Sequence, residues 1–350
     1  MRSKKEHLLS LYSLAQKCFE HILAPITPIS LIKTLSRATP LLPFYHIVSD
    51  NRKIEYVRHL YTYRSVKEFK NDIDFFLRNY SPITLADLLE GLKNSRKLPK
   101  NPFLLTFDDG FREIHDIIAP ILKKKGVSAT FFLTWNFLDN KELSYRHKAS
   151  ILIERYHRSG NLDAKDKIRN ILLKNGKEST EFKTSMLSVR YDERILLDDI
   201  ALLLDVDFNQ YLSNNKPYLD SQQVEKLITD GFSIGAHSID HPFYSQVSLE
   251  EQLYQTRKSV TLIADKFSLG YRVFACPYSD YGVSKDYFKQ IFRYLDASFG
   301  TSGMMKDIYH RNFQRLRMEN TTATAKNIVA KHHVQKLFLC AIGKNRIKRN

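Results

Sequence analysis

Apolar residues between positions 41 and 133 alternate between two patterns. Short unbroken apolar runs, typical of buried strands, occupy residues 41–48, 103–107 and 128–133. Between these runs, apolar side chains recur every three or four residues, which predicts helices at 66–80, 85–92 and 114–125. Strand–helix–strand alternation favours parallel strand pairing, so we expect an α/β sheet or barrel.

The alternation stops between about 141 and 216, where charged helical stretches appear without a convincing strand. These stretches are 149–158, 165–174 and 193–204, and we interpret the whole segment as a helical insertion. The alternation then resumes with helices at 221–230 and 249–267 and strands at 232–236, 272–275, 297–300 and 315–318. Ser248 and Glu251 have the spacing of a capping box at the start of the helix at 249–267.

Positive charge is concentrated at the two ends of the chain. The 350 residues carry a net charge of +16, of which residues 1–40 contribute +4 and residues 321–350 contribute +7. We therefore separate an N-terminal extension (1–40), a body (41–320) and a basic C-terminal helix or tail (321–350). Because a nucleic-acid binder would place such an excess along a working face, we expect no nucleic-acid partner. Basic ends suit an anionic membrane surface, or they only solubilise the protein.

The opening residues predict an amphipathic helix, ended near residue 23 by Pro25. Its apolar positions are Leu8, Leu11, Ala15, Cys18, Phe19 and Ile22. Polar residues interrupt any secretory signal, and no run approaches the roughly 18 apolar residues that span a bilayer. Three widely spaced cysteines argue against a disulfide framework. We expect a cytoplasmic protein, with peripheral contact at the inner face of the membrane as an option.

Two carboxylates follow the predicted strand at 103–107. Asp108 and Asp109 precede Gly110 in the sequence TFDDG, and the loops at the carboxyl ends of parallel strands are where catalytic groups gather. Adjacent carboxylates repel each other, so one could bind a cation while the other accepts a proton. Alone, Asp-Asp-Gly is also an ordinary turn sequence.

Two histidines follow the predicted strand at 232–236. His237 and His241 lie four residues apart in HSIDHP and can present both rings to one metal ion. If a carboxylate is the third ligand, the metal ion keeps open coordination positions for water. A divalent ion lowers the pKa of the water bound to it. Each motif alone is common. Together, however, the first supplies carboxylates and the second supplies two imidazoles, and a hydrolytic metal site needs both.

These two motifs resemble those of the polysaccharide deacetylase family, whose catalytic unit is also called the NodB homology domain. The resemblance covers roughly residues 41–320 without the insertion, and it implies a distorted, incomplete (β/α) barrel. It also implies that Asp108 is the general base and that Asp109, His237 and His241 hold a divalent ion. We expect Zn²⁺, with Co²⁺, Mn²⁺ or Ni²⁺ as alternatives.

The third family motif, Arg-x-Pro-Tyr, is altered here. Pro277 and Tyr278 are present, but Ala275 stands where the family has the Arg that orients the base. The resemblance assigns Pro277 to the substrate site and the backbone N–H of Tyr278 to the oxyanion. Arg315 or Arg317, on a late strand, could replace the missing Arg. Versions of this motif without Arg resemble the poly-N-acetylglucosamine deacetylase branch.

The general acid of the family, a histidine in Leu-x-x-His, has no clean counterpart. His46 at the end of the first strand is our preferred candidate, because that strand ends beside the site in such a barrel. His310 and His332 are alternatives. Trp135, the sole tryptophan, could line the sugar cleft, although a place in the core is the simpler interpretation.

The sequence therefore predicts metal-dependent hydrolysis of N-acetyl groups on a carbohydrate. The substrate could be a lipid-linked or lipopolysaccharide-type sugar, or a free polysaccharide. The alternative is a catalytically silent carbohydrate-binding protein, which the missing Arg and the uncertain acid suggest.

Overall fold

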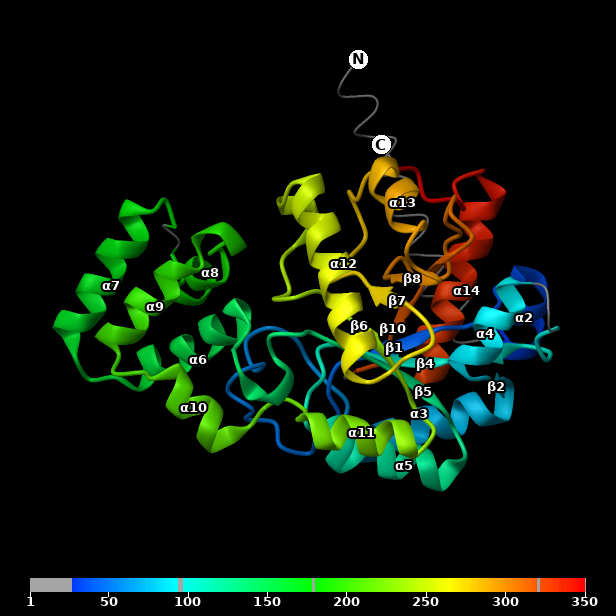
Figure 1. Ribbon diagram of the computed structural model, residues 1–350, viewed down its shortest axis with the longest axis horizontal. Helices are drawn as coiled ribbons and strands as arrows, with labels where there is room; N and C mark the ends of the chain where they lie inside the picture. Colours follow the sequence, from blue (N-terminus) through cyan, green and yellow to red (C-terminus); the bar gives the residue numbers. More distant parts are fainter. Residues whose placement is uncertain (1–26, 94–96, 178–179, 320–321, 350) are drawn as a thin grey trace, which may run out of the picture.

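Eight parallel strands form the centre of the computed structural model, which describes residues 27–93, 97–177, 180–319 and 322–349 (Figure 1). Their order is β10-β1-β4-β5-β6-β7-β8-β9. The strands are β1 (Pro43–Tyr45), β4 (Leu105–Phe107), β5 (Ala129–Leu133), β6 (Ser233–Ala236), β7 (Val273–Ala275), β8 (Ala297–Gly300), β9 (Asn312–Gln314) and β10 (Leu316–Arg317).

One stretch of chain joins the two edges of this sheet. β9 pairs with β8, whereas β10, which begins two residues later, pairs with β1. Arg315, between β9 and β10, donates its backbone N–H to Gly300 at the end of β8. The sheet is thus nearly closed, and the expected distorted (β/α) barrel is confirmed.

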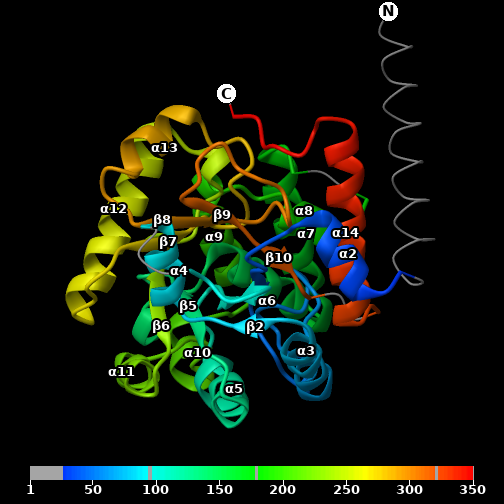
Figure 2. The ribbon, with the colours of Figure 1, turned by 90° about the vertical axis from the view of Figure 1, so that its right-hand side faces the viewer.

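Helices surround the strands, as Figure 2 shows. They are α2 (Ile29–Ser36), α3 (Val66–Asn79), α4 (Leu85–Leu92), α5 (Ala119–Lys125), α11 (Ser221–Thr229), α12 (Leu249–Lys266), α13 (Lys285–Ile291) and α14 (Ala325–Ala341). Side chains alternate between the two faces of each strand. On β5, Phe131 joins the core under the helices, whereas Phe132 joins a second core with Leu42 and Phe299.

The insertion forms a separate helical lobe at one side of the barrel (Figure 1). Its helices are α6 (Tyr145–Arg158), α7 (Leu162–Lys174), α8 (Phe182–Leu187), α9 (Ile195–Leu203) and α10 (Phe208–Asn215). Ile153, Ile168 and Leu197 belong to a core of its own. Helix α6 begins four residues before the predicted position because Ser144 caps it, accepting the N–H of Arg146.

The basic C-terminal segment contains the packed helix α14. Val329, Ala330 and Val334 are buried against α2 and α3. The imidazole of His333 hydrogen-bonds Ser36 at 2.6 Å and Tyr80 at 3.0 Å. A purely solubilising tail does not fit this packing. The amphipathic helix predicted before residue 24 lies outside the described residues.

Two local predictions were wrong. The single strand at 103–107 is divided, because β3 (Pro102–Phe103) pairs with β2 (Ser81–Pro82) whereas β4 pairs with β1 and β5. The capping box is only half formed: Ser248 accepts the N–H of Glu251, but the Glu251 carboxylate accepts instead from Gln255 at 2.8 Å. None of the described helices has the length and apolar character needed to cross a membrane.

Candidate active site

The carboxyl ends of four strands bring residues of the two sequence motifs together with His46 and Tyr278. His46 follows β1, Asp108 and Asp109 follow β4, His237 follows β6, and Tyr278 lies three residues beyond β7. Because all strands are parallel, these ends lie at one edge of the barrel, where active sites of such folds are found.

Asp109, His237 and His241 form a buried three-residue cluster. One potential ligand atom from each lies within 4.8 Å of the other two. Asp109 Oδ1 lies 3.1 Å from Nε2 of His241 and 3.5 Å from Nε2 of His237. Among the described residues this oxygen has no hydrogen-bond partner of good geometry, although it is buried. A buried, unsatisfied carboxylate oxygen beside two imidazoles is the donor set expected for a divalent ion.

The state of His237 also suits a metal ligand. Its Nδ1 lies 2.8 Å from the carbonyl oxygen of Ala275. Since a carbonyl only accepts, Nδ1 carries the proton, and Nε2 presents its lone pair to the cluster. Burial, only partly opposed by Asp108, lowers the pKa of His237 to about 4, so the ring is neutral at pH 7.

The turns that carry these ligands adopt unusual backbone angles. Asp109 has φ 71° and His241 has φ 64°, which lie in the left-handed region that residues other than glycine seldom occupy. His241 is held there by its N–H, which donates to Ser238 Oγ at 2.9 Å. Such strain, about 1–3 kcal/mol per residue, gathers at functional sites.

Arg315 forms a bidentate ion pair with Asp108. Its Nη1 and Nη2 lie 2.6 and 2.7 Å from the two carboxylate oxygens, and Arg315 is fully buried. Burial would raise the pKa of Asp108, but Arg315 holds it below its usual range. Asp108 is therefore an ionised carboxylate. Arg317, the other candidate, is half exposed, and its Nε lies 3.8 Å from the carboxylate of Glu319.

Glu319, which the sequence analysis missed, pairs with His46. Its Oε2 lies 2.6 Å from His46 Nδ1, and its Oε1 accepts the backbone N–H of the same residue at 2.6 Å. The ring of Tyr61 stacks on the imidazole at 4.8 Å. Burial disfavours the charged ring, but Glu319 overcomes this effect and raises the pKa of His46 to about 9. A signal was available, since Glu319 lies just beyond the last strand, and the end of that strand lies beside the end of the first when the barrel closes.

Replacing Glu319 by Gln should move the alkaline limit of activity. The folded pKa of His46, about 9, lies above its ordinary 6.5, so the pair contributes stability that is complete below pH 6.5 and lost as the pH rises through about 9. If protonated His46 is the acid, kcat/KM of the wild type should fall above about pH 9, and that of Glu319→Gln at a lower pH. Profiles of kcat/KM against pH, measured for both proteins between pH 5 and 11, test this. Coincident alkaline limbs would exclude His46 as the general acid.

Tyr278 stands at the wall of the site. Its backbone φ is 57°, its ring stacks on Phe243 at 3.6 Å, and it contacts the edge of His241 at 4.4 Å. Burial raises the pKa of its hydroxyl well above the usual value. The hydroxyl therefore stays protonated.

A cavity of about 450 Å³ opens over these groups. It is lined by Phe44, His46, Leu60, Tyr61, Asp108, Asp109, Ser144, Arg146, His147, His241, Phe243, Tyr278, Ser279, Thr301 and Arg317. The insertion therefore helps to build the site. His147, which no sequence pattern singled out, hydrogen-bonds the hydroxyl of Tyr218 at 2.5 Å, and burial lowers its pKa to about 3.

Several candidate residues lie elsewhere. Trp135 packs against the main core with the Lys141 ammonium 4.9 Å from its ring centroid, and neither it nor Pro277 lines this cavity. Arg315 lies behind Asp108 rather than at the cavity wall. His310 borders a different cavity, and the ring of His332 lies against Gly303.

Comparisons with known proteins bear on the family and the fold of this chain. Residues 95–296, more than half of the chain, match the family model described as polysaccharide deacetylase. No curated protein matches by sequence. The fold is similar to a Streptococcus pyogenes deacetylase, PplD, solved with acetate (TM-score 0.54, 14% identity, 84% of this chain and 97% of that one). It is also similar to a de-N-acetylase of Aggregatibacter actinomycetemcomitans (TM-score 0.53, 14% identity, 82% and 97%).

Proposed function

Since the chain belongs to the polysaccharide deacetylase family, we propose that it is a metal-dependent enzyme that removes N-acetyl groups from a glycan or glycolipid. One observation carries the proposal: an ionised carboxylate, Asp108, lies beside a convergent cluster of Asp109, His237 and His241, and Asp108, Asp109 and His241 line one cavity. A base and a ligand set so placed suit hydrolysis of an amide.

The three clustered residues would hold the ion, with Zn²⁺ as the first choice because two imidazoles and one carboxylate are ligands it prefers. When bound there, a divalent ion polarises a carbonyl and makes water more acidic.

The protein's own residues divide the remaining work. Asp108, kept ionised by Arg315, accepts the proton of the attacking water. The backbone N–H of Tyr278 stabilises the oxyanion that forms at the acetyl carbon. His46, kept protonated by Glu319, donates a proton to the departing amine.

The Asp108–Arg315 pair weakens the case for a silent carbohydrate-binding protein. That alternative was suggested by Ala275, which stands where the family has the Arg that orients the base. In this chain Arg315, between β9 and β10, reaches the carboxylate of the proposed base.

The substrate is proposed to be a lipid-linked or lipopolysaccharide-type sugar, with free poly-N-acetylglucosamine and peptidoglycan as rivals. Acetate release should be measured on all of these and on chitin-type oligomers, with chelator-stripped protein reloaded with Zn²⁺, Co²⁺, Mn²⁺ or Ni²⁺. We expect metal-dependent release from at least one substrate and none from Asp108→Asn. Bound metal with no release from any of them would favour the binding protein.

A peripheral role at a membrane remains a separate proposal. It rests on the basic ends of the chain, which would be attracted to an anionic leaflet. Sedimentation with vesicles containing anionic lipid, at low and high salt, is the direct test.

A further inference from the structure

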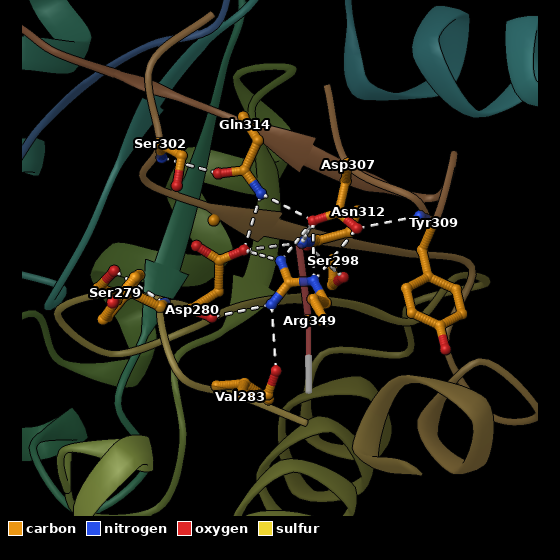
Figure 3. A network of polar contacts seen from close by, with 12 residues as sticks. Ser279, Asp280, Val283, Ser298, Ser302, Asp307, Tyr309, Asn312, Gln314 and Arg349 are labelled. Carbon is orange, nitrogen blue, oxygen red and sulfur yellow. Dashed lines mark hydrogen bonds and ion pairs between the residues drawn. The ribbon is translucent and has the colours of Figure 1, made fainter. Parts of the chain in front are cut away.

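Arg349, the second-to-last residue, is buried between two loops of the barrel (Figure 3). These loops follow β7 and β8 and contain Asp280 and Asp307, respectively. The guanidinium pairs through Nη2 with both carboxylates, and Nε lies 3.1 Å from Asp307 Oδ2. Nη1 donates to the backbone oxygens of Asp280 at 2.9 Å and Val283 at 3.4 Å.

Asp280 is the centre of this network. Its Oδ2 also accepts from Asn312 at 2.9 Å and from Gln314 at 2.7 Å, both on β9, and its Oδ1 accepts the N–H of Thr301 at 3.2 Å. A Cβ on Gly300 would lie 2.3 Å from this carboxylate, so glycine is required there. Burial would raise the pKa of Asp280, but Arg349 holds it below its usual range.

The network continues directly into the candidate active site. Asp280 lies two residues after Tyr278, whose N–H has the proposed oxyanion role. The carbonyl of Tyr278 accepts from the hydroxyl of Thr301 at 3.3 Å. Tyr278 therefore adopts its positive φ in a loop that hydrogen bonds hold in place. The residues that follow Tyr278 in this loop bond to Thr301, β9 and Arg349.

We propose that Arg349 is a positioning residue, which holds the loop at 277–283 so that the N–H of Tyr278 faces the oxyanion. This inference rests on the proposed function and extends it to the end of the chain. It gives the basic C-terminal segment a positioning role in catalysis, although Arg349 itself does not line the cavity.

The charges in the network explain why the arginine matters. Asp280 and Asp307 both bond the amides of Asn312 and Gln314, so their carboxylates lie close together and are buried. Without Arg349 they would repel each other in a medium of low dielectric constant. The loops would separate, or one of the carboxylates would take up a proton. In either case the backbone oxygens of Asp280 and Val283 would have lost the donor that Arg349 supplies.

The test uses Arg349→Ala and Arg349→Lys in the full chain, with Lys348→Ala as matched control because Lys348 is an exposed neighbour of the same charge. For Arg349→Ala we expect kcat to fall about 10- to 100-fold, since small displacements and lost oxyanion donors have effects of this size. KM and metal content should change little. Arg349→Lys keeps the positive charge but lacks the planar guanidinium with its several donors, so its kcat should be intermediate. The kcat of Lys348→Ala should match that of the wild type.

A second variant separates positioning from folding. Adding Asp307→Asn to Arg349→Ala removes one of the repelling carboxylates, so thermal stability should recover while kcat stays low. Hydrogen–deuterium exchange should report faster exchange in residues 277–283 of Arg349→Ala, with α3 unchanged.

The outcomes distinguish this inference from the proposed function. An active wild type with unchanged kcat in folded Arg349→Ala would overturn the positioning role and leave the deacetylase proposal intact. If the wild type releases no acetate from any substrate, the proposed function fails. In that case, unchanged exchange at 277–283 in Arg349→Ala would also overturn the claim that Arg349 holds the loop.

Discussion

Replacement of Asp109 by alanine should abolish deacetylation and remove the bound divalent ion. The carboxylate is buried, and its Oδ1 faces two imidazole nitrogens without a hydrogen-bond partner of good geometry among the described residues. Removing it leaves two ligands for the ion. A Lewis-acid ion supplies several kcal/mol to such a reaction, so we expect activity to fall about a thousandfold or more.

Metal content by mass spectrometry and acetate release measure the two effects. Added Zn²⁺ should raise the melting temperature of the wild type and leave that of Asp109→Ala unchanged, because only a protein that binds the ion is stabilised by it. His310→Ala is the control, since His310 is exposed and borders a different cavity. An Asp109→Ala protein that keeps full activity after chelation would refute the metal site.

Arg315→Met should cause the largest loss of stability among the site variants. Arg315 is fully buried, and it bonds both oxygens of Asp108 as well as Thr106 Oγ1 at 3.2 Å. Removing one partner of a buried ion pair leaves an uncompensated charge, which costs about 3–5 kcal/mol. Urea unfolding at pH 7 should report this difference. Arg317→Ala, which removes a half-exposed arginine two residues later, should change stability far less.

The same variant should change how activity depends on pH. In the wild type the pKa of Asp108 lies below its ordinary 3.8. The pair therefore contributes stability that is present above that pH and is lost as the pH falls through the folded pKa. Without Arg315, burial raises the pKa of Asp108, so the residual activity of Arg315→Met should rise at higher pH than that of the wild type. An unchanged acidic limb would show that Asp108 is not the base.

Much of the fold could be predicted because its signals are local. The strand at 297–300 and the helix at 85–92 were predicted with the bounds that the structure has. The predicted strand boundaries were wrong where consecutive residues pair with different strands, as on the two sides of Leu104. Pairing partners leave no trace in apolar periodicity. The part played by His147 could not be foreseen either, since its helix approaches the barrel only through tertiary packing.

The sequence by itself determined the two short motifs and their place at strand ends. Asp108 and Asp109 are adjacent, and His237 and His241 are four residues apart, so local chemistry was enough to predict a base and a ligand set. Tertiary structure alone decided which distant residues complete the site. Arg315, Glu319 and Arg349 reach their partners across 207, 273 and 69 positions of sequence. Closure of the barrel places the last strand beside the first, and burial then requires each carboxylate to find a cation.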